Sequence, residues 1–396
     1  MAFSASSTSV KAQVTLLTLT QALAMTTDTV LITTAALVGY AIAADKSLAT
    51  VPLAMRQVAT MAATIPASML MERVGRRGGF LLGTAVGVLG ASLSIYSLML
   101  ANFGLFTLAM MLLGLANGFV GYYRFAAADI ADEAFRSQAI SWVIAGGIIA
   151  AVLGPWLANG SQGWFDSELY IGAFVAVVAL QLLSAVCLLF LNIPHTAKRQ
   201  MQESVRSLKT IARQPKFWVA TVGSTISYGV MAFIMTATPL AMTDHTHSFA
   251  QSAAVIQWHV FGMFGPALFT GWLIKRFGVI AIISTGAVLN LGCVAINLAG
   301  TSFWNFAIAL FLLGLGWNFM YVGSTTLLTE TYAPTEKAKV QAAHDFIVFS
   351  FVAATTFFSG RIFYRFDWDM LNQMSWPLVL ATLAVVMWLQ RRRVTA

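Results

Sequence analysis

The sequence has little charge. Asp, Glu, Lys and Arg make up 10% of its 396 residues, and hydrophobic residues make up 58%. A soluble domain carries about 25% charged residues, so this chain has too few to cover a surface in water. Cysteine is also scarce, and because Cys187 and Cys293 both lie in apolar runs, a disulfide scaffold is excluded. The composition equally excludes disorder, collagen and a coiled coil. It predicts a protein that crosses a membrane several times.

Several motifs of other protein classes are missing. The sequence contains no Gly-rich nucleotide loop, no zinc-protease His-Glu-x-x-His helix and no Ser nucleophile elbow. Residues 1–13 are polar and Ser-rich and lack the pattern of a cleaved signal peptide. The stretch 244–247 has the composition of a metal site, but four neighbours in one loop are more often solvated. We therefore expect no enzymatic activity, no cofactor and no metal.

Long apolar runs dominate the chain. A helix needs about 20 mostly apolar residues to cross a bilayer, and the sequence offers twelve such runs. They lie at 14–41, 49–71, 79–101, 106–128, 139–158, 170–192, 217–242, 250–274, 279–300, 304–328, 343–362 and 371–389. The ten-residue alternating segments of a membrane β-barrel are not found. The predicted fold class is an all-α membrane protein with twelve transmembrane helices.

The positive charges are distributed unevenly among the loops. Of the 23 Lys and Arg residues, 18 fall in one set of loops and the termini, three fall in the opposite loops, and Arg56 and Arg124 fall inside spans. Such a bias places the richer side in the cytoplasm. Both termini are therefore expected there, in what would be a bacterial inner membrane. The net charge of +8 becomes an orientation signal, and a nucleic-acid partner loses its support.

The longest polar stretch, 195–216, separates the first six runs from the last six. Basic and apolar residues alternate along it, which suggests an amphipathic helix on the membrane surface. These residues are Lys198, Arg206, Lys209 and Arg213 with Met201, Val205, Leu208 and Ile211. The predicted division is a first six-helix bundle at 1–192, a cytoplasmic amphipathic linker at 193–216 and a second six-helix bundle at 217–396.

The two halves repeat each other. The Leu-Leu-Gly-Leu run at 112–115 returns at 312–315, and Leu70, Arg73 and Gly75 return 203 positions later as Leu273, Arg276 and Gly278. Asp129 has a counterpart in Glu330. Matches in the same order at nearly one offset indicate a parallel repeat, as in transporters whose halves rock around a midplane site.

The segment 68–77 carries a family resemblance. It resembles motif A of the major facilitator superfamily, Gly-x-Leu-Ala-Asp-Arg-x-Gly-Arg-Arg, with Ser68 at the first Gly and Glu72 at the Asp. The second copy, 271–278, has Lys275 at the acidic position. The resemblance covers about 14–390 and implies two pseudo-symmetric six-helix bundles. It also implies a cytoplasmic latch between arginines and carboxylates at helix ends. The predicted latch residues are Glu72, Arg73, Gly75, Arg76, Asp129, Arg276 and Glu330. The alternative is that these arginines only set orientation.

The fifth span is similar in part to motif C of proton-coupled drug exporters. It contains Gly147, Gly154 and Pro155, but Ala158 and Asn159 replace the final Gly pair. Small residues and Pro give a kinked, closely packed helix. This favours an antiporter, with a generic kink as the alternative. The exporters' motif B is not matched, because 114–118 lacks its Arg.

Asp28 is the strongest candidate for proton coupling. It lies 14 residues from Val14 and 13 from Ala41, close to the middle of the first predicted span. An ionisable group there is costly and is by default a functional hypothesis. Asp28 could carry protons, bind a cationic substrate, or pair with a buried Arg for packing alone.

Three further ionisable residues lie in spans. Arg56 and His259 are counterparts at the 203 offset, and they could bind an anionic group or form an outer gate. Arg56 could instead snorkel to the surface, and His259 could be structural. Arg124 could line the inner cavity, snorkel, or pair with Asp129.

Amides and aromatic residues on the presumed cavity spans are candidate substrate contacts. They are Gln21, Asn117, Tyr122, Tyr228, Gln257, Trp258, Trp317, Asn318 and Tyr321. The sequence as a whole predicts a secondary transporter, working as a monomer by alternating access on a small organic molecule. Proton-coupled export is the first interpretation. Import of an organic anion by a proton symporter or facilitator is the alternative. Outside transport, the alternative interpretation is an intramembrane enzyme or receptor.

Overall fold

The computed structural model describes residues 10–132, 135–165, 170–193 and 206–394. These residues form helices joined by short connections, and no strand occurs among them. The chain separates into two compact units. The first holds the described residues within 1–31 and 59–198, and the second holds those within 32–58 and 199–396. The predicted fold class, a helical membrane protein, is confirmed.

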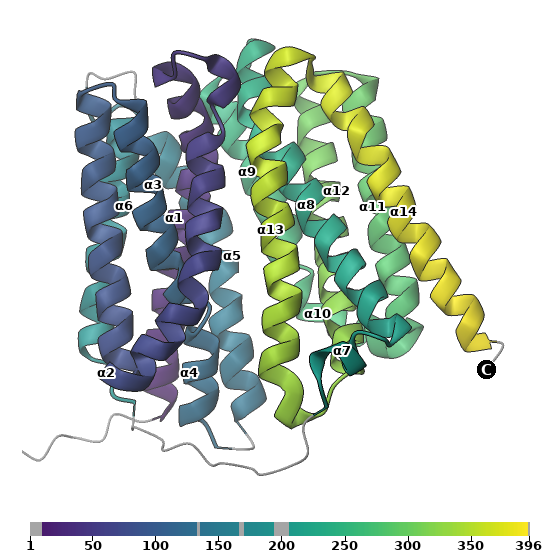
Figure 1. Cartoon of the computed structure of the whole chain (residues 1–396). Coiled ribbons are helices and arrows are strands. Elements are labelled where there is room, and N and C mark those ends of the chain that lie inside the picture. Colours follow the sequence, from purple (N-terminus) through teal and green to yellow (C-terminus); the bar gives the residue numbers. More distant parts are fainter. Residues whose placement is uncertain (1–9, 133–134, 166–169, 194–205, 395–396) are drawn as a thin grey trace, which may run out of the picture. The chain divides into compact units, whose positions relative to one another are not determined.

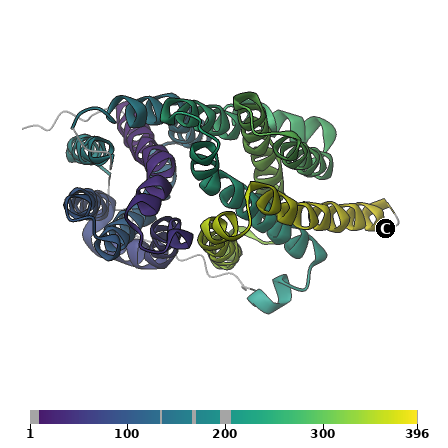
Figure 2. The same cartoon turned by 90° about the horizontal axis from the view of Figure 1, so that it is seen from above.

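The helices follow the predicted spans closely. The elements up to the linker are α1 (Val10–Ile42), η1 (Lys46–Leu48), α2 (Val51–Met99), α3 (Phe103–Val120), α4 (Tyr123–Ile130), α5 (Arg136–Gly160) and α6 (Ile171–Leu189). Those that follow are α7 (Leu208–Ile211), α8 (Pro215–Asp244), α9 (Phe249–Phe264), α10 (Ala267–Phe277), α11 (Val279–Ala299), α12 (Phe303–Thr329), η2 (Pro334–Glu336), α13 (Lys337–Arg365) and α14 (Trp368–Val394). Figure 1 shows them along the chain, and Figure 2 shows most of them end-on, with α14 inclined to its neighbours in the second unit.

Ten helices in the described residues are long and apolar enough to cross a membrane, or eleven if the bent pair α9 and α10 is one span. One of the ten segments, Lys46–Met99, is 54 residues long and contains both runs predicted at 49–71 and 79–101. Gly75 interrupts it with a non-helical φ of 79° and ψ of 161°. The count of twelve spans stays a prediction.

The predicted surface helix of the linker falls largely outside the described residues, because 194–205 are not described. The part that is described contains only the short helix α7. Its Ile211 is fully buried, and Leu208 and Lys209 are exposed.

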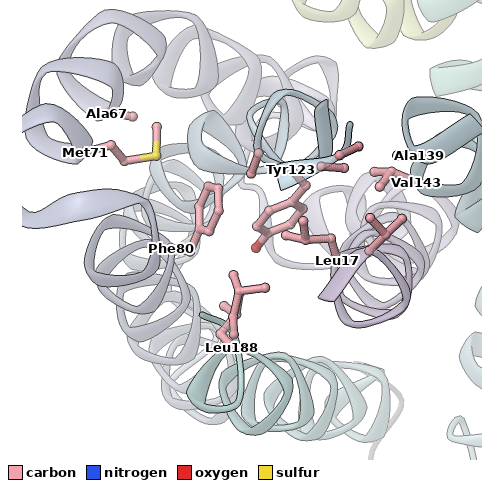
Figure 3. Packing of buried hydrophobic residues seen from close by; sticks show 13 residues of the cluster. Leu17, Ala67, Met71, Phe80, Tyr123, Ala139, Val143 and Leu188 are labelled. Carbon is pink, nitrogen blue, oxygen red and sulfur yellow. The ribbon is translucent and has the colours of Figure 1, made fainter. Parts of the chain in front are cut away.

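The first unit has a core of apolar residues at one end of its helices. Figure 3 shows Leu17, Phe80, Tyr123 and Leu188 converging from α1, α2, α4 and α6. The rings of Phe80 and Tyr123 meet edge to face with centroids 4.6 Å apart, a favoured aromatic geometry. Four helices are therefore fixed together where α2 passes through Gly75.

The second unit is held by close helix contacts and by capping. Ser248 and Ser302 each form a capping box at the start of α9 and α12, with Gln251 and Asn305 as partners. These reciprocal bonds satisfy N–H groups that have no partner inside the helix. Thr50, just before α2, donates through Oγ1 to the carbonyl of Phe357 at 3.3 Å and accepts from the N–H of Gly360 at 3.2 Å. The segment 32–58 is thereby tied to α13.

Candidate functional site

Asp28 lies half-buried on α1 in the first unit. Its neighbour Thr29 is 4% exposed and donates through Oγ1 to the carbonyl of Met25 at 2.9 Å. A Cβ placed on Gly154 of α5 would lie 2.5 Å from Cβ of Thr29. The absence of a side chain at Gly154 therefore lets α5 approach α1 directly beside Asp28. The motif C-like segment therefore packs against the residue that follows the best coupling candidate in the sequence.

Threonines near Asp28 face the packed side of α1. Thr26 and Thr33 are fully buried, and Thr26 donates through its hydroxyl to the carbonyl of Ala22 at 2.7 Å. Gly146 of α5 lies against the backbone of Ala22, since a Cβ there would meet its N at 3.0 Å. Gly147 and Pro155 are buried on the same helix, and Gln21 is half-buried on α1. Small residues thus bring the two helices together over several turns.

Three other candidates of the first unit occupy different positions. Tyr122, at the N-terminus of α4, donates through its hydroxyl to the carbonyl of Thr64 on α2 at 2.8 Å. Asn117 is half-buried on α3. Arg124 is exposed, with its guanidinium 4.8 Å from the ring centre of Phe125. Asp129, considered a possible partner of Arg124, pairs instead with Arg76.

Arg56 and His259 both belong to the second unit. Arg56 is 2% exposed, and it ranks among the largest fully buried side chains of the described chain. His259 is fully buried, and its Nδ1 donates to the carbonyl of Leu310 on α12 at 2.8 Å. Its Nε2 has no hydrogen-bond partner among the described residues. Both side chains are enclosed by the protein, and this burial does not fit snorkelling of Arg56 to the surface.

An aromatic cluster forms where α8, α12 and α13 meet. Trp317 and Tyr321 stack with their centroids 5.1 Å apart and their planes at 10°. Tyr228 lies 5.4 Å from Trp317 and 5.5 Å from Tyr321, and its centroid is 5.7 Å from that of Phe349. Three of the predicted substrate contacts are thus brought together, and we call Trp317, Tyr321, Tyr228 and Phe349 the aromatic cluster.

The remaining candidates lie away from this cluster or next to it. Trp258 is 53% exposed and meets Phe261 and Phe311 edge to face. Gln257 is half-buried on α9. Asn318 follows Trp317 and is 2% exposed, with both ends of its amide hydrogen-bonded to neighbouring elements. Phe349 was not predicted. It lies among many other phenylalanines of the sequence, and nothing in its spacing distinguishes it.

The residues proposed for the latch make separate contacts. In the first unit, Nη2 of Arg76 lies 2.5 Å from Oδ2 of Asp129. In the second, Nζ of Lys216 lies 2.8 Å from Oε2 of Glu330, and the guanidinium of Arg276 stacks over Trp272 at 5.2 Å. Arg73 and Glu72 are exposed. Gly75 and Gly278 share a left-handed backbone, with φ of 79° and 87°, so the two motif copies bend the chain alike. The latch role itself stays a prediction.

One charged cluster was not predicted from the sequence. The carboxylate of Glu336 is 2% exposed and accepts from Nε, Nη2 and the backbone N–H of Arg206 at 2.9, 2.6 and 2.8 Å. It also accepts from the N–H of Ala333 at 2.9 Å. The hydrogen bonds from Arg206 and Ala333 lower the pKa of Glu336 to about 2. The two residues lie 130 positions apart, and no local pattern links them.

Known proteins resemble this chain over nearly its whole length. The sequence model described as Major Facilitator Superfamily matches residues 17–356. The riboflavin transporter RfnT of Brucella anthropi is 35% identical over 378 residues, covering 95% of both chains. The uncharacterized MFS-type transporter YddS of Bacillus subtilis is 28% identical over 379 residues, covering 91% of this chain and 87% of the relative.

Solved structures support the same fold. The human organic anion transporter MFSD10 has a TM-score of 0.69 at 12% identity, covering 96% of this chain and 100% of that structure. A mutant of the nucleoside transporter NupG has a TM-score of 0.71 at 14% identity, covering 95% and 99%. The predicted integral membrane transporter of a small molecule is confirmed, and an enzyme is not supported. By its sequence match and its fold, the chain belongs to the major facilitator superfamily.

Proposed function

We propose that this chain transports riboflavin, or a flavin with the same ring system, across a membrane. The observation that carries the proposal is the 35% identity to a riboflavin transporter, which extends over 95% of both chains. An identity spread over the full length includes the helices that bear the candidate site, and it is not confined to the motifs that all members share.

The aromatic cluster supports a flat, ring-shaped substrate. Riboflavin carries a planar tricyclic ring, and such a ring gains most from aromatic faces that offer offset-stacked or edge-on contacts. Trp317 and Tyr321 supply a stacked pair, and Tyr228 supplies a tilted ring beside both. Apolar residues Ala232, Val348 and Val352 pack behind Tyr228 and Tyr321 and hold them in place.

We further propose that Asp28 couples transport to protons. A half-buried carboxylate beside the close α1–α5 contact could exchange a proton when water reaches it. Its neutral form would be closed off from water at a lower free-energy cost than its charged form. Proton-coupled export follows from the motif C-like segment. The alternative, import of an organic anion, draws on the buried Arg56. Riboflavin has no ionised group at neutral pH, so it does not require that arginine as a counterion.

The test is transport in proteoliposomes loaded or bathed with riboflavin, under a pH gradient of either direction. Riboflavin fluorescence reports movement in both directions, which separates export from import. Trp317→Ala is expected to abolish saturable transport, and Trp317→Phe to retain part of it. Asp28→Asn is expected to remove the response to the gradient while leaving riboflavin exchange. Absence of riboflavin movement with the wild-type protein would overturn the substrate proposal.

We also propose an inner-membrane monomer with both termini in the cytoplasm. The support is the unequal distribution of Lys and Arg between the two sets of loops. The orientation is checked with a single cysteine placed at Tyr40, which is 41% exposed. An impermeant thiol reagent added to intact cells is expected to label this cysteine from the outside. Chemical cross-linking in the same membranes tests whether the protein is a monomer.

A further inference from the structure

The candidate eighth span is broken. Its two parts, α9 and α10, meet at an angle of 43°, with Gly265 and Pro266 between them. Proline has no N–H, so Pro266 cannot donate to the carbonyl of Gly262 four residues before it, and the hydrogen-bond ladder of the helix is interrupted. The next carbonyl, that of Met263, would in a continuous helix accept from the N–H of Ala267, but α10 starts anew at Ala267.

Asn318 of α12 supplies a donor to this carbonyl. Its Nδ2 donates to the carbonyl of Met263 at 2.6 Å, and its Oδ1 accepts from the hydroxyl of Thr270 on α10 at 2.6 Å. Because a carbonyl can only accept, the orientation of the amide is fixed by Met263. One side chain therefore bridges the last turn of α9 and the first turn of α10. We call these bonds the Asn318 clasp.

The two arms of the broken span are held very differently. On α9, a Cβ at Gly262 would lie 2.7 Å from the carbonyl oxygen of Phe311, and a Cβ at Gly314 would lie 2.3 Å from that of His259. Together with the bond from His259 to Leu310, these contacts press α9 against the backbone of α12. α9 therefore cannot move without breaking its close packing against α12.

The other part of the broken span, α10, has little buried surface. Thr270 is its one buried residue, in a helix described throughout, and a Cβ at Gly271 would meet nothing within 4 Å. Leu268, Trp272 and Phe277 are 74%, 55% and 56% exposed. The hydroxyl of Thr270 shares its one hydrogen between Oδ1 of Asn318 at 2.6 Å and the carbonyl of Pro266 at 2.8 Å, and it links α10 to α12.

We propose that α10 is a hinged arm that turns about Gly265 and Pro266 during transport, and that the Asn318 clasp sets its angle. Asn318 is then a positioning residue that does not contact the substrate. The hinge adjoins the aromatic cluster, because Trp317 precedes Asn318 and packs 6.2 Å from Phe264, the last residue of α9. The arm also carries the second motif A copy, so its angle decides where Arg276 lies.

The bend can be measured without any substrate. Cys187 and Cys293, the two cysteines of the chain, are replaced by Ala, and spin labels are placed at Trp258 on α9 and Phe277 on α10, which are 53% and 56% exposed. At 1.5 Å per residue the two backbone positions lie at most about 28 Å apart along the helices, a range suited to pulsed electron paramagnetic resonance. The full-length protein is studied in nanodiscs.

Thr270→Val is expected to change the distance distribution by about fivefold in the ratio of its populations, as for the loss of one hydrogen bond. Asn318→Ala removes two hydrogen bonds and should change it in the same direction at least as far. The double variant should go no further than Asn318→Ala. Thr270→Ser, which keeps the hydroxyl, should restore the distribution. Thr285→Val is the matched control, since its hydroxyl bonds only within α11 and is exposed.

Two results would overturn the clasp. One is a single distance that neither variant alters. The other is a change with Asn318→Ala but none with Thr270→Val, which would give Asn318 a role of its own, such as substrate contact. In transport assays the clasp variants should alter turnover at an unchanged KM, whereas a substrate contact would raise KM. Because the distances need no riboflavin, they test the hinge even if the substrate proposal fails.

Discussion

In the first half of the chain α3 meets α2 through Gly118, and in the second half α12 meets the broken span through Asn318, which lies 200 positions later. A Cβ at Gly118 would lie 2.5 Å from Cβ of Ala63, so the two backbones touch there. At Asn318 an amide fills the same place and bonds to both arms of α9 and α10. Pro66 lies inside α2, and the helix continues through it. Where a helix stays whole, small residues suffice to pack it, and where it breaks, a polar side chain must satisfy the freed carbonyl.

The largest effect is expected when the asparagine of the second half is introduced at the equivalent glycine of the first half. Gly118→Asn places an amide where α2 leaves no space, against Ala63 and the carbonyl of Thr60, which is 3.3 Å from a Cβ at this site. Overpacking of this kind costs about 1–3 kcal/mol, and against backbone the upper end applies. The apparent Tm in detergent should fall by many degrees, and the yield of folded protein with it. A variant as stable as wild type would show that α2 can yield as α10 does.

A smaller effect, equal in both halves, is expected at the motif A glycines. Gly75 and Gly278 adopt φ of 79° and 87° with ψ of 161° and 151°, a conformation almost restricted to glycine. Gly75→Ala and Gly278→Ala should each cost about 1–3 kcal/mol through backbone strain. At Gly278 a Cβ would meet nothing within 4 Å, so strain is the only cause there. Thermal unfolding of the two variants compares the bends, and a neutral Gly278→Ala would contradict the shared geometry.

The ion pair between Glu336 and Arg206 should make the stability of the second unit depend on pH. The pKa of Glu336, held at about 2 by its bonds from Arg206, lies below its ordinary value of 4.5. A lowered pKa stabilises the folded state fully above pH 4.5, and this stabilisation is lost as the pH falls toward 2. Glu336→Gln should therefore lower the Tm at pH 7, and its difference from wild type should shrink below pH 4.5. Unfolding curves at pH 7, 5 and 3.5 measure it.

The control for this prediction comes from the first unit. Asp129 is 38% exposed and pairs with Arg76, so Asp129→Asn should change the Tm far less than Glu336→Gln at pH 7. Equal losses at the two sites would mean that the buried carboxylate owes little to its extra hydrogen bonds.

The smallest effect is expected at Lys216. Its ammonium pairs with Glu330 at 2.8 Å, but the two side chains are 40% and 38% exposed. Exposed pairs contribute about 0–1 kcal/mol. Lys216→Met should shift the Tm by no more than a degree or two, and salt should shift wild type to the same degree. A large loss would show that the latch acts at Glu330 as well.

Much of the fold could be predicted because the hydrophobic pattern of each span is local. The runs at 304–328 and 279–300, for example, match α12 and α11 within a few residues. The break between Phe264 and Ala267 was missed, since an isolated Pro in an apolar run is equally compatible with a bent continuous helix. Trp317, Tyr321 and Tyr228 were predicted together from their residue type, and the structure brings them into contact. Arg206 and Glu336 could not be paired, because their contact depends on how the chain returns after 130 residues.

One strip of the first half of the chain groups with the second compact unit. Residues 32–58 belong to the second unit, so the chain passes between the units within α1, again within α2 and a third time after α6. Two of the three connections are continuous helices. Cutting the polypeptide in the linker would therefore separate most of the second unit from the strip 32–58, which would stay joined to the first unit. A fragment ending before the linker would carry 32–58 without the α13 backbone that Thr50 binds. Co-expressed halves should assemble only when residues 32–58 of the first half pack against the second half.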